Sequence, residues 1–362
     1  MPQAPLFRML DLHEAIERER QHPGGRLFVS DYNGGHPFVA DYLGPLADSP
    51  PHRLADVTRY AAIDEDHALR AKIARLHSDR DEEETGPDRV IPAGGSSGLL
   101  STFCTWLHLN GVRRVHYLPP VYYKLAYFFR EFGIDPVSVS PLHAHQPGFA
   151  PELPDERTVL LLTDPLWYTG RPVPGELIKR IADWQLATGS TVFVDGTFQY
   201  LHWDGARREE TAALPAELTL RLVCPTKYLS IHGYRCAHLI VPSRLREPLA
   251  ELHLNLHGDV TVADRQFAHR AADLMLDGEG NRRLIEHVRA NHRGLLDSGA
   301  LRADAPVDTG YFLFARPAAP ADRLLALDQR HFELTGHDGF VRINLLNGTA
   351  LEGLRALGAP GR

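Results

Sequence analysis

The sequence predicts an α/β protein, with a large domain whose mainly parallel sheet is covered by helices on both faces, and a smaller α+β domain. Short apolar runs alternate with helical patterns between residues 90 and 241, which is typical of βαβ units. Beyond Pro242 helical patterns dominate, and apolar runs return only near the C-terminus. A chain of 362 residues is long enough for two such domains.

Residues 1–45 are expected to form a helix and an arm that packs with the small domain. Residues 1–22 have an amphipathic helical pattern, and the turn Asn33-Gly34-Gly35 interrupts the loop-rich stretch that follows. A further helix is expected at 67–77, before an acidic surface loop.

The large domain is expected to span residues 46–243. Apolar runs predict strands, and the periodic stretches between them predict helices. We expect strands at 90–93, 114–118, 136–139, 159–163, 191–194, 222–224 and 236–241, and helices at 99–109, 122–132 and 175–188. In such sheets ligands bind outside the carboxyl ends of the strands, where Asp195, Lys227 and the loop after Thr163 fall.

Residues 244–362 are assigned to the small domain. Helical patterns dominate residues 245–296, and the apolar runs at 310–316 and 339–346 predict strands of an α+β layer.

Composition excludes several classes of function. A net charge of -7 and an isoelectric point near 6.3, without a stripe of basic residues, argue against a nucleic-acid surface. The chain has no apolar run of the ~20 residues that a membrane helix needs, and its N-terminus is too charged for a secretory signal, so we expect a cytoplasmic protein. Buried reduced thiols are expected at Cys104, Cys224 and Cys236, and no metal site, because the histidines show no HExxH or CxxC pattern.

Lys227 differs from the other three lysines of the chain. Lys72, Lys124 and Lys179 lie in helical patterns, where a lysine is usually solvated. Lys227 lies where a strand ends in a polar loop that also carries Arg235. A lysine that is partly desolvated near an arginine has a lowered pKa and can attack an aldehyde, so we expect Schiff-base chemistry there.

The glycine-rich turn 94–98 opens a helix after a strand. Its backbone N–H groups and the hydroxyls of Ser96 and Ser97 could bind an anion at the positive end of the helix. The turn has neither a GxGxxG pattern nor a Walker lysine, so a single phosphate fits better than a nucleotide. The alternative is a tight connection that needs small residues.

Three charged residues near predicted strands complete the set of candidates. Asp195 could pair with a protonated ring nitrogen, or cap the next turn. Arg235 could bind a phosphate and lower the pKa of Lys227. Arg342 lies inside an apolar strand and could bind a substrate carboxylate, or form a structural salt bridge.

Together these residues resemble the fold-type I enzymes of pyridoxal phosphate (PLP), and within them the class I/II aminotransferase superfamily, with a length similar to histidinol-phosphate aminotransferase. The segment CPTKYLSIHGYR, 224–235, is similar to the family signature S-x-S-K-x(5)-G-x-R. The resemblance implies that Lys227 forms the Schiff base with PLP and moves the proton at the substrate's α-carbon, and that Asp195 pairs with the pyridine nitrogen.

The resemblance also implies roles for further residues. The phosphate would be bound by Gly95, Ser96, Ser97, Thr226 and Arg235. Tyr122 would stack on the pyridine ring, and Arg342 would bind the substrate carboxylate beside Asn33, Gly34 and Tyr168. Tyr60 would reach the phosphate of a neighbouring subunit, which implies a homodimer with shared active sites.

Two positions depart from the family pattern. The family segment N-P-x-N-P-T-G reads Asp164-Pro-Leu-Trp167-Tyr168-Thr-Gly170, so Trp167 replaces the second asparagine. The tyrosine of the family's D-x-x-Y is Phe198 here. In the family these two side chains donate hydrogen bonds to the phenolic oxygen of PLP. Without them the oxygen keeps more negative charge, which should raise the pKa of the Schiff base.

The resemblance implies a PLP-dependent aminotransferase that acts on an amino acid. The altered surroundings of the phenolic oxygen leave open a PLP-dependent lyase, cyclase, decarboxylase or oxidase, and an inactive binding subunit is a further alternative. The side-chain pocket is expected to include Trp167, Tyr168, Tyr123, His232 and Tyr234.

Overall fold

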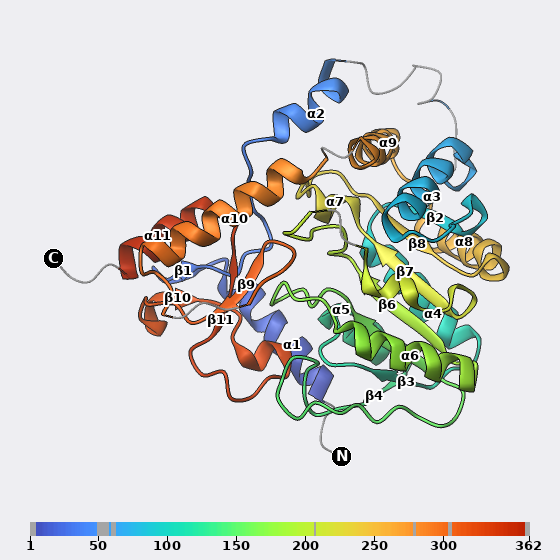
Figure 1. Ribbon diagram of the computed structural model, residues 1–362, viewed down its shortest axis with the longest axis horizontal. Coiled ribbons are helices and arrows are strands. Elements are labelled where there is room, and N and C mark those ends of the chain that lie inside the picture. The colour runs from blue at the N-terminus through green and yellow to red at the C-terminus, as the bar shows by residue number, and fades with distance from the viewer. Residues whose placement is uncertain are drawn as a thin grey trace.

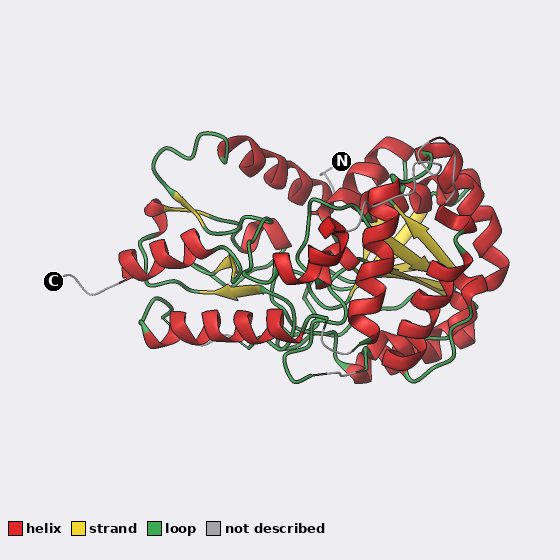
Figure 2. Cartoon of the chain, turned by 90° about the horizontal axis from the view of Figure 1, so that it is seen from above, coloured by secondary structure: helices red, strands yellow, loops and turns green. Residues whose placement is uncertain are grey.

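The computed structural model describes residues 5–48, 58, 63–205, 208–277, 280–302 and 306–358. Figure 1 shows a large twisted sheet with its helices and, beside it, a smaller group of strands and helices near the C-terminus. Figure 2, a view from above, shows helices on both sides of the large sheet. The predicted fold class is confirmed.

Seven strands form the large sheet. They are β2 (Val90–Ala93), β3 (Arg114–Tyr117), β4 (Asp135–Ser138), β5 (Val159–Thr163), β6 (Thr191–Gly196), β7 (Thr219–Val223) and β8 (Ala237–Ile240). Their spatial order is β2-β8-β7-β6-β5-β3-β4. The strand β8 runs antiparallel to β2 and β7, and the other pairs are parallel.

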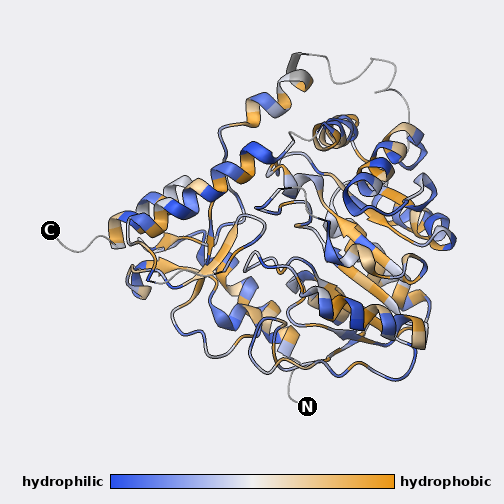
Figure 3. Ribbon diagram, viewed as in Figure 1, coloured by the Kyte–Doolittle hydropathy of each residue, from blue (hydrophilic) through white to orange (hydrophobic). Residues whose placement is uncertain are grey.

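The central strands are apolar on both faces because helices cover both. Val159 and Leu161 of β5 pack with α4 (Ser96–Leu109), α5 (Tyr123–Phe132) and α8 (Ser243–His257). Leu160 and Leu162 point to the other face, toward α6 (Gly175–Thr188). Figure 3 shows these strands as an apolar interior between amphipathic helices. At the edge with β2 and β8, α3 (His67–Asp81) packs on β2 and on α9 (Val262–Leu276).

The smaller layer contains two pairs of strands and two helices. β9 (Phe312–Ala315) pairs antiparallel with β11 (Val341–Asn344), and β1 (Leu27–Phe28) pairs parallel with β10 (Leu324–Leu325). The helices are α10 (Arg282–Asp297) and α11 (Gly348–Gly358). The remaining helices are α2 (Val39–Asp48), the one-turn α7 (Pro225–Tyr228) and the 3-10 turns η2 (Ile63–Glu65), η3 (Pro87–Arg89), η4 (Glu210–Ala213), η5 (Ala216–Leu218), η6 (Ala321–Arg323) and η7 (Gln329–Phe332).

The N-terminal helix α1 (Pro5–Glu19) connects the two layers. It packs against α5 of the large sheet and against η7 of the smaller layer. Its buried face consists of Leu6, Met9, Leu10, His13 and Ile16. The division into an arm, a large and a small domain stays a prediction; α8 and α9 lie beside α4 and α3 of the large sheet.

The strand register places the candidate residues of the sheet side by side. Thr163, the last residue of β5, pairs with Asp195 near the end of β6, and Asp195 pairs with Leu222 of β7. Lys227 does not lie in a loop, as the sequence led us to expect, but on α7. Pro225 opens this helix, where the missing N–H of proline costs no hydrogen bond.

Candidate active site

Two adjoining cavities open at the carboxyl ends of the parallel strands, and they share Tyr32, Ser96, Tyr122 and Lys227. We call the smaller one, of about 40 Å³, the inner cavity; it is lined by Tyr32, Ser96, Tyr122, Thr163, Trp167, Asp195, Thr197, Phe198, Lys227 and Arg342. The outer cavity, of about 730 Å³, adds Asn33, Ser97, Tyr123, Lys124, Thr226, Arg235 and the α1 residues Leu10, His13, Glu14 and Glu17.

Lys227, on α7, lines the inner cavity. Its backbone N–H donates to the Cys224 carbonyl over 2.8 Å, and its ammonium lies 5.7 Å from the ring centre of Phe198. The pKa of Lys227 is lowered to about 8, mainly by burial; the charges of Arg235 and Arg342 act in the same direction and Cys224 in the opposite one. A larger share of this amine is therefore neutral near pH 8 than for an exposed lysine.

Asp195 is a buried carboxylate beside this lysine. It accepts hydrogen bonds from the backbone N–H of Thr197 at 3.2 Å and from the Thr197 hydroxyl. Burial raises the pKa of Asp195, while Thr197 and Lys227 act in the opposite direction. The two bonds from Thr197 fix the direction of the carboxylate, which lines the inner cavity.

The glycine-rich turn lies against Arg235. Gly95 has a φ of +114°, and a Cβ at this position would come within 3.0 Å of the Arg235 guanidinium. Ser96 and Ser97 begin α4 and line the outer cavity with Arg235. Thr226 also lines it, although its hydroxyl lies 3.2 Å from the Cys236 carbonyl. The turn, the helix N-terminus and the guanidinium therefore converge on one cradle for an anion.

Arg342 is fully buried in a cage of aromatic rings. Its guanidinium carbon lies 4.3 Å from the ring centres of Tyr32 and Phe312 and 5.2 Å from that of Trp167. One nitrogen, Nη2, donates to the Ser30 carbonyl over 2.6 Å. Nε and Nη1 are buried and have no acceptor among the described residues. Arg342 forms no salt bridge with the described residues, and burial lowers its pKa.

Other orphaned donors line the same inner cavity. The indole N–H of Trp167 and the hydroxyl of Thr163 are buried and have no hydrogen-bond partner among the described residues. Unpaired buried donors are uncommon, and one explanation for them is a ligand with acceptor oxygens.

Tyr168 turns away from both cavities. Its hydroxyl is 2.7 Å from Nδ1 of His143, and its ring stacks on Phe332 of the smaller layer at 4.3 Å. Gly34 packs against Leu346, and the carbonyl of Asn33 accepts from the Asn344 side chain at 3.2 Å. Tyr60 lies outside the described residues.

Several lining residues were not expected from the sequence. Tyr32, Thr163, Thr197 and Phe312 surround Asp195 and Arg342, but no short motif marks them. Lys124 was expected to be solvated, whereas it lines the outer cavity, and burial and Arg235 lower its pKa. Its place in the first turn of α5, two residues after Tyr122, was the available signal.

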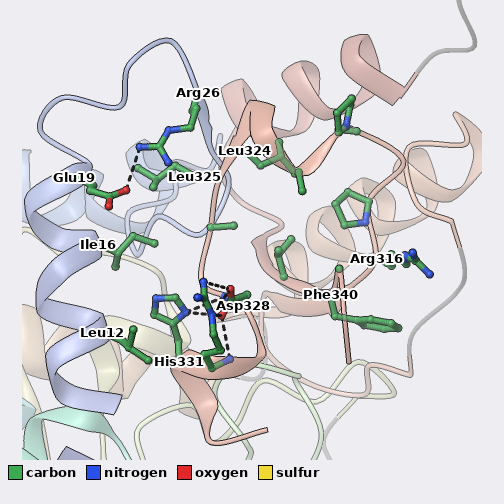
Figure 4. Close-up of a pocket in the computed structure, with 18 of the residues that line it drawn as sticks. Leu12, Ile16, Glu19, Arg26, Arg316, Leu324, Leu325, Asp328, His331 and Phe340 are labelled. Atoms are coloured by element: carbon green, nitrogen blue, oxygen red, sulfur yellow. Dashed lines mark hydrogen bonds and ion pairs between the residues drawn. The ribbon is translucent and has the colours of Figure 1, made fainter. Parts of the chain in front are cut away.

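A separate cavity of about 680 Å³ lies on the opposite face of α1 (Figure 4). It is lined by Leu12, Ile16 and Glu19 of α1 and by residues around β10, η7 and the start of β11. The Arg26–Glu19 and Arg330–Asp328 ion pairs lie at its edge. It contains none of the candidate residues, so the strand-end cavities are the candidate active site.

A lysine on a short helix after β7, an acid near the end of β6 and an anion cradle at the start of α4 are typical of enzymes that carry PLP. The chain belongs to the class I and II aminotransferases, whose family model matches residues 52–347. Members of this family use PLP, so the protein is a PLP-dependent transferase of the aminotransferase type.

Solved structures agree in fold at low sequence identity. N-succinyldiaminopimelate aminotransferase from Mycobacterium tuberculosis is 17% identical, with a TM-score of 0.71 over 96% of this chain and 95% of that one. Aspartate aminotransferase from Thermotoga maritima is 14% identical, with a TM-score of 0.74 over 96% of each chain. A methionine aminotransferase from Escherichia coli is 17% identical, with a TM-score of 0.74 over 99% and 100%. None of the curated proteins matches this sequence.

The residues present fit PLP. The Gly95 cradle leaves room for a phosphate beside Arg235, Asp195 offers a carboxylate for the ring nitrogen, and Lys227 lines the cavities of both. In the described part of the chain, no helix is long and apolar enough to span a membrane.

Proposed function

We propose that this aminotransferase binds PLP on Lys227 and the carboxylate of an amino-acid substrate on Arg342. The observation that carries the proposal is the set of orphaned donors in the inner cavity, which includes two nitrogens of the Arg342 guanidinium. A bidentate arginine suits a carboxylate, and the aromatic cage keeps its planar group in one orientation.

The chain's own residues would divide the work as follows. Arg235, Gly95, Ser96, Ser97 and Thr226 would bind the phosphate, and Tyr122 would stack on the ring. Asp195 would keep the ring nitrogen protonated, and PLP held in this way would supply an electron sink for the substrate's α-carbon. The Lys227 amine would remove and return the proton at that carbon.

Borohydride reduction of the holoenzyme followed by peptide mapping tests the site. We expect a pyridoxyl group on Lys227. A modified lysine elsewhere, or none, contradicts the proposal and would favour an inactive binding subunit.

A lyase, cyclase, decarboxylase or oxidase on the same fold is the second candidate, because Trp167 and Phe198 stand where the family has its two donors to the phenolic oxygen. Incubation of amino acids with and without pyruvate or 2-oxoglutarate separates the two. Keto-acid-dependent formation of a new amino acid supports transamination, whereas turnover without an acceptor supports the second candidate.

We also propose a cytoplasmic homodimer with shared active sites, in which Tyr60 contributes to the neighbouring phosphate site. Mixing Lys227→Ala subunits with Tyr60→Phe subunits tests the sharing. Both defects then fall in one of the two sites of a mixed dimer, so the other site should regain wild-type activity. Activity no higher than that of the Tyr60→Phe enzyme alone would contradict sharing.

A further inference from the structure

Trp167 is fixed in place by packing from three parts of the chain. Its ring centre lies 5.1 Å from that of Phe332, at the end of η7, and 5.9 Å from that of His13, on α1. The Arg342 guanidinium lies over its face, and only 5% of the residue is exposed. A side chain held on several sides has little freedom to turn its N–H toward solvent.

This N–H finds no acceptor among the described residues, although it is buried. An indole nitrogen can only donate a hydrogen bond, so the buried N–H can be satisfied only by an acceptor atom. The inner cavity that Trp167 lines also holds the cationic groups of Arg342 and Lys227, and its one carboxylate, Asp195, accepts from Thr197. None of the acceptor atoms of the described residues bonds the indole N–H, and an anion bound beside these two cations would supply an oxygen for it.

Phe198 and Tyr168 cannot replace this donor, because Phe198 has no polar atom and the Tyr168 hydroxyl is engaged with His143. The hydroxyls of Thr163 and Tyr32 remain as orphaned donors in the cavity, so they must be separated from Trp167 by experiment.

We propose that the indole N–H of Trp167 donates a hydrogen bond to an anionic oxygen bound in the inner cavity, in place of the amide that the family carries at this position. The inference rests on the proposed function. Two oxygens have the required chemistry: the phenolic oxygen of PLP and the carboxylate of the substrate. In this role Trp167 is a positioning residue, and its effect is visible without turnover.

The test replaces only the N–H. Benzothienylalanine, a tryptophan analogue with sulfur in place of the ring N–H, is introduced at position 167 by stop-codon suppression. The matched control carries the same analogue at Trp184, whose N–H already donates to the Pro154 carbonyl at 2.6 Å outside both cavities. Trp167→Phe, Thr163→Val, Tyr32→Phe and Tyr168→Phe complete the set, and borohydride mapping first verifies that each variant carries PLP on Lys227.

The first measurement is the pH at which the visible absorbance of the holoenzyme changes, without substrate. Loss of a hydrogen bond to the phenolic oxygen makes this oxygen more basic, so the midpoint should rise by about one pKa unit or more in the position-167 variants. The Trp184 and Tyr168 variants should keep the wild-type midpoint. This result assigns the N–H to the cofactor.

The second measurement is the dissociation constant of 3-phenylpropionate, a carboxylate without an amino group, followed by the cofactor absorbance. Weakening of about tenfold or more at position 167, with an unchanged pH midpoint, assigns the N–H to the substrate carboxylate.

The proposal is overturned if the analogue at position 167 changes neither quantity, or if only Thr163→Val or Tyr32→Phe changes them. Absence of PLP from Lys227 in the wild-type enzyme would instead contradict the proposed function. A 15N spectrum of the indole groups provides an independent check, since the chain has four tryptophans. The resonance of Trp167 is the one that Trp167→Phe removes. If the cofactor accepts the hydrogen bond, this resonance should move downfield when PLP is added to the apoenzyme. If the substrate carboxylate accepts it, the resonance should move downfield when 3-phenylpropionate is added.

Discussion

Burial shifts the pKa values of single residues in the site and so determines their chemistry. Lys227 has a pKa of about 8 because its ammonium is desolvated and lies near Arg235 and Arg342. The apoenzyme should therefore react with PLP faster as pH rises, with a midpoint near 8 and a plateau above it. A free lysine analogue, with a pKa of ~10.4, should keep accelerating over the same range. The rate of the absorbance change after mixing measures this, and a midpoint near 10 would contradict the assignment.

The lowered pKa of Lys227 also affects the stability of the apoenzyme. Between pH 8 and ~10.5 the unfolded chain binds more protons at this lysine than the folded chain does, so unfolding becomes less favourable as pH rises. The cost in folding free energy of burying the charged Lys227 is fully present below pH 8. Lys227→Met removes it, so the gain in stability from this variant should be largest below pH 8 and smaller at pH 10 in urea unfolding.

Asp195 gives a second prediction for a single residue. Asp195→Asn keeps the shape of the side chain but removes the charge that would hold a protonated ring nitrogen. A hydrogen bond to a charged group is worth about 1.5–3 kcal/mol, so PLP should bind about 10- to 100-fold more weakly. Fluorescence quenching measures the affinity. Asp183→Asn, an exposed position on α6, removes the same charge and should leave the affinity unchanged.

At the level of single elements, the role of Gly95 in the turn before α4 can be tested against a second glycine, Gly111, at the other end of the same helix. Gly95 and Gly111 flank α4, with φ of +114° and +72°, so alanine is strained at either end. A Cβ at Gly95 also meets Arg235, whereas a Cβ at Gly111 meets nothing within 4 Å. Gly95→Ala should weaken PLP binding by about tenfold or more. Gly111→Ala should lower the melting temperature but keep the affinity, and an equal loss in both variants would contradict the cradle.

Strands and long helices were predictable because their patterns are local. β2, β5 and α6 begin and end where the apolar runs and the helical period placed them, since strands buried on both faces need apolar residues on both. The helix α7 was not predictable, because four residues show no period and Pro225 fits a loop as well as a first helical turn. The helix α11 and the two-residue strands β1 and β10 were also not expected.

Over the whole molecule, the candidate site was predictable where a motif runs along the chain and not where the fold brings distant residues together. Lys227 and Arg235 share one motif, and Asp195 ends an apolar strand. The cage of Tyr32, Trp167 and Phe312 around Arg342 joins the arm, the large sheet and the smaller layer, so no local pattern could indicate it. The site is therefore built from residues of both layers.

Glu333 connects the two layers and should respond to pH. It follows η7, and its carboxylate accepts from the Tyr117 hydroxyl at the end of β3 at 3.2 Å. Burial raises its pKa from 4.5 to about 7, against the effect of Tyr117. Between pH 4.5 and 7 the folded chain binds more protons at Glu333 than the unfolded chain does. The free energy of unfolding therefore falls as pH rises through this range, and the full loss remains above pH 7.

Glu333→Gln should therefore stabilise the apoenzyme at pH 8, by about 1 kcal/mol or more, and change little at pH 4.5, where the carboxyl is already protonated in the folded chain. The glutamine keeps the side-chain shape and can still accept from Tyr117. Urea unfolding at the two pH values measures the difference, with Glu131→Gln on the exposed face of α5 as the control. Equal effects of Glu333→Gln at both pH values would show that the carboxylate is not desolvated, which would contradict its burial against Tyr117.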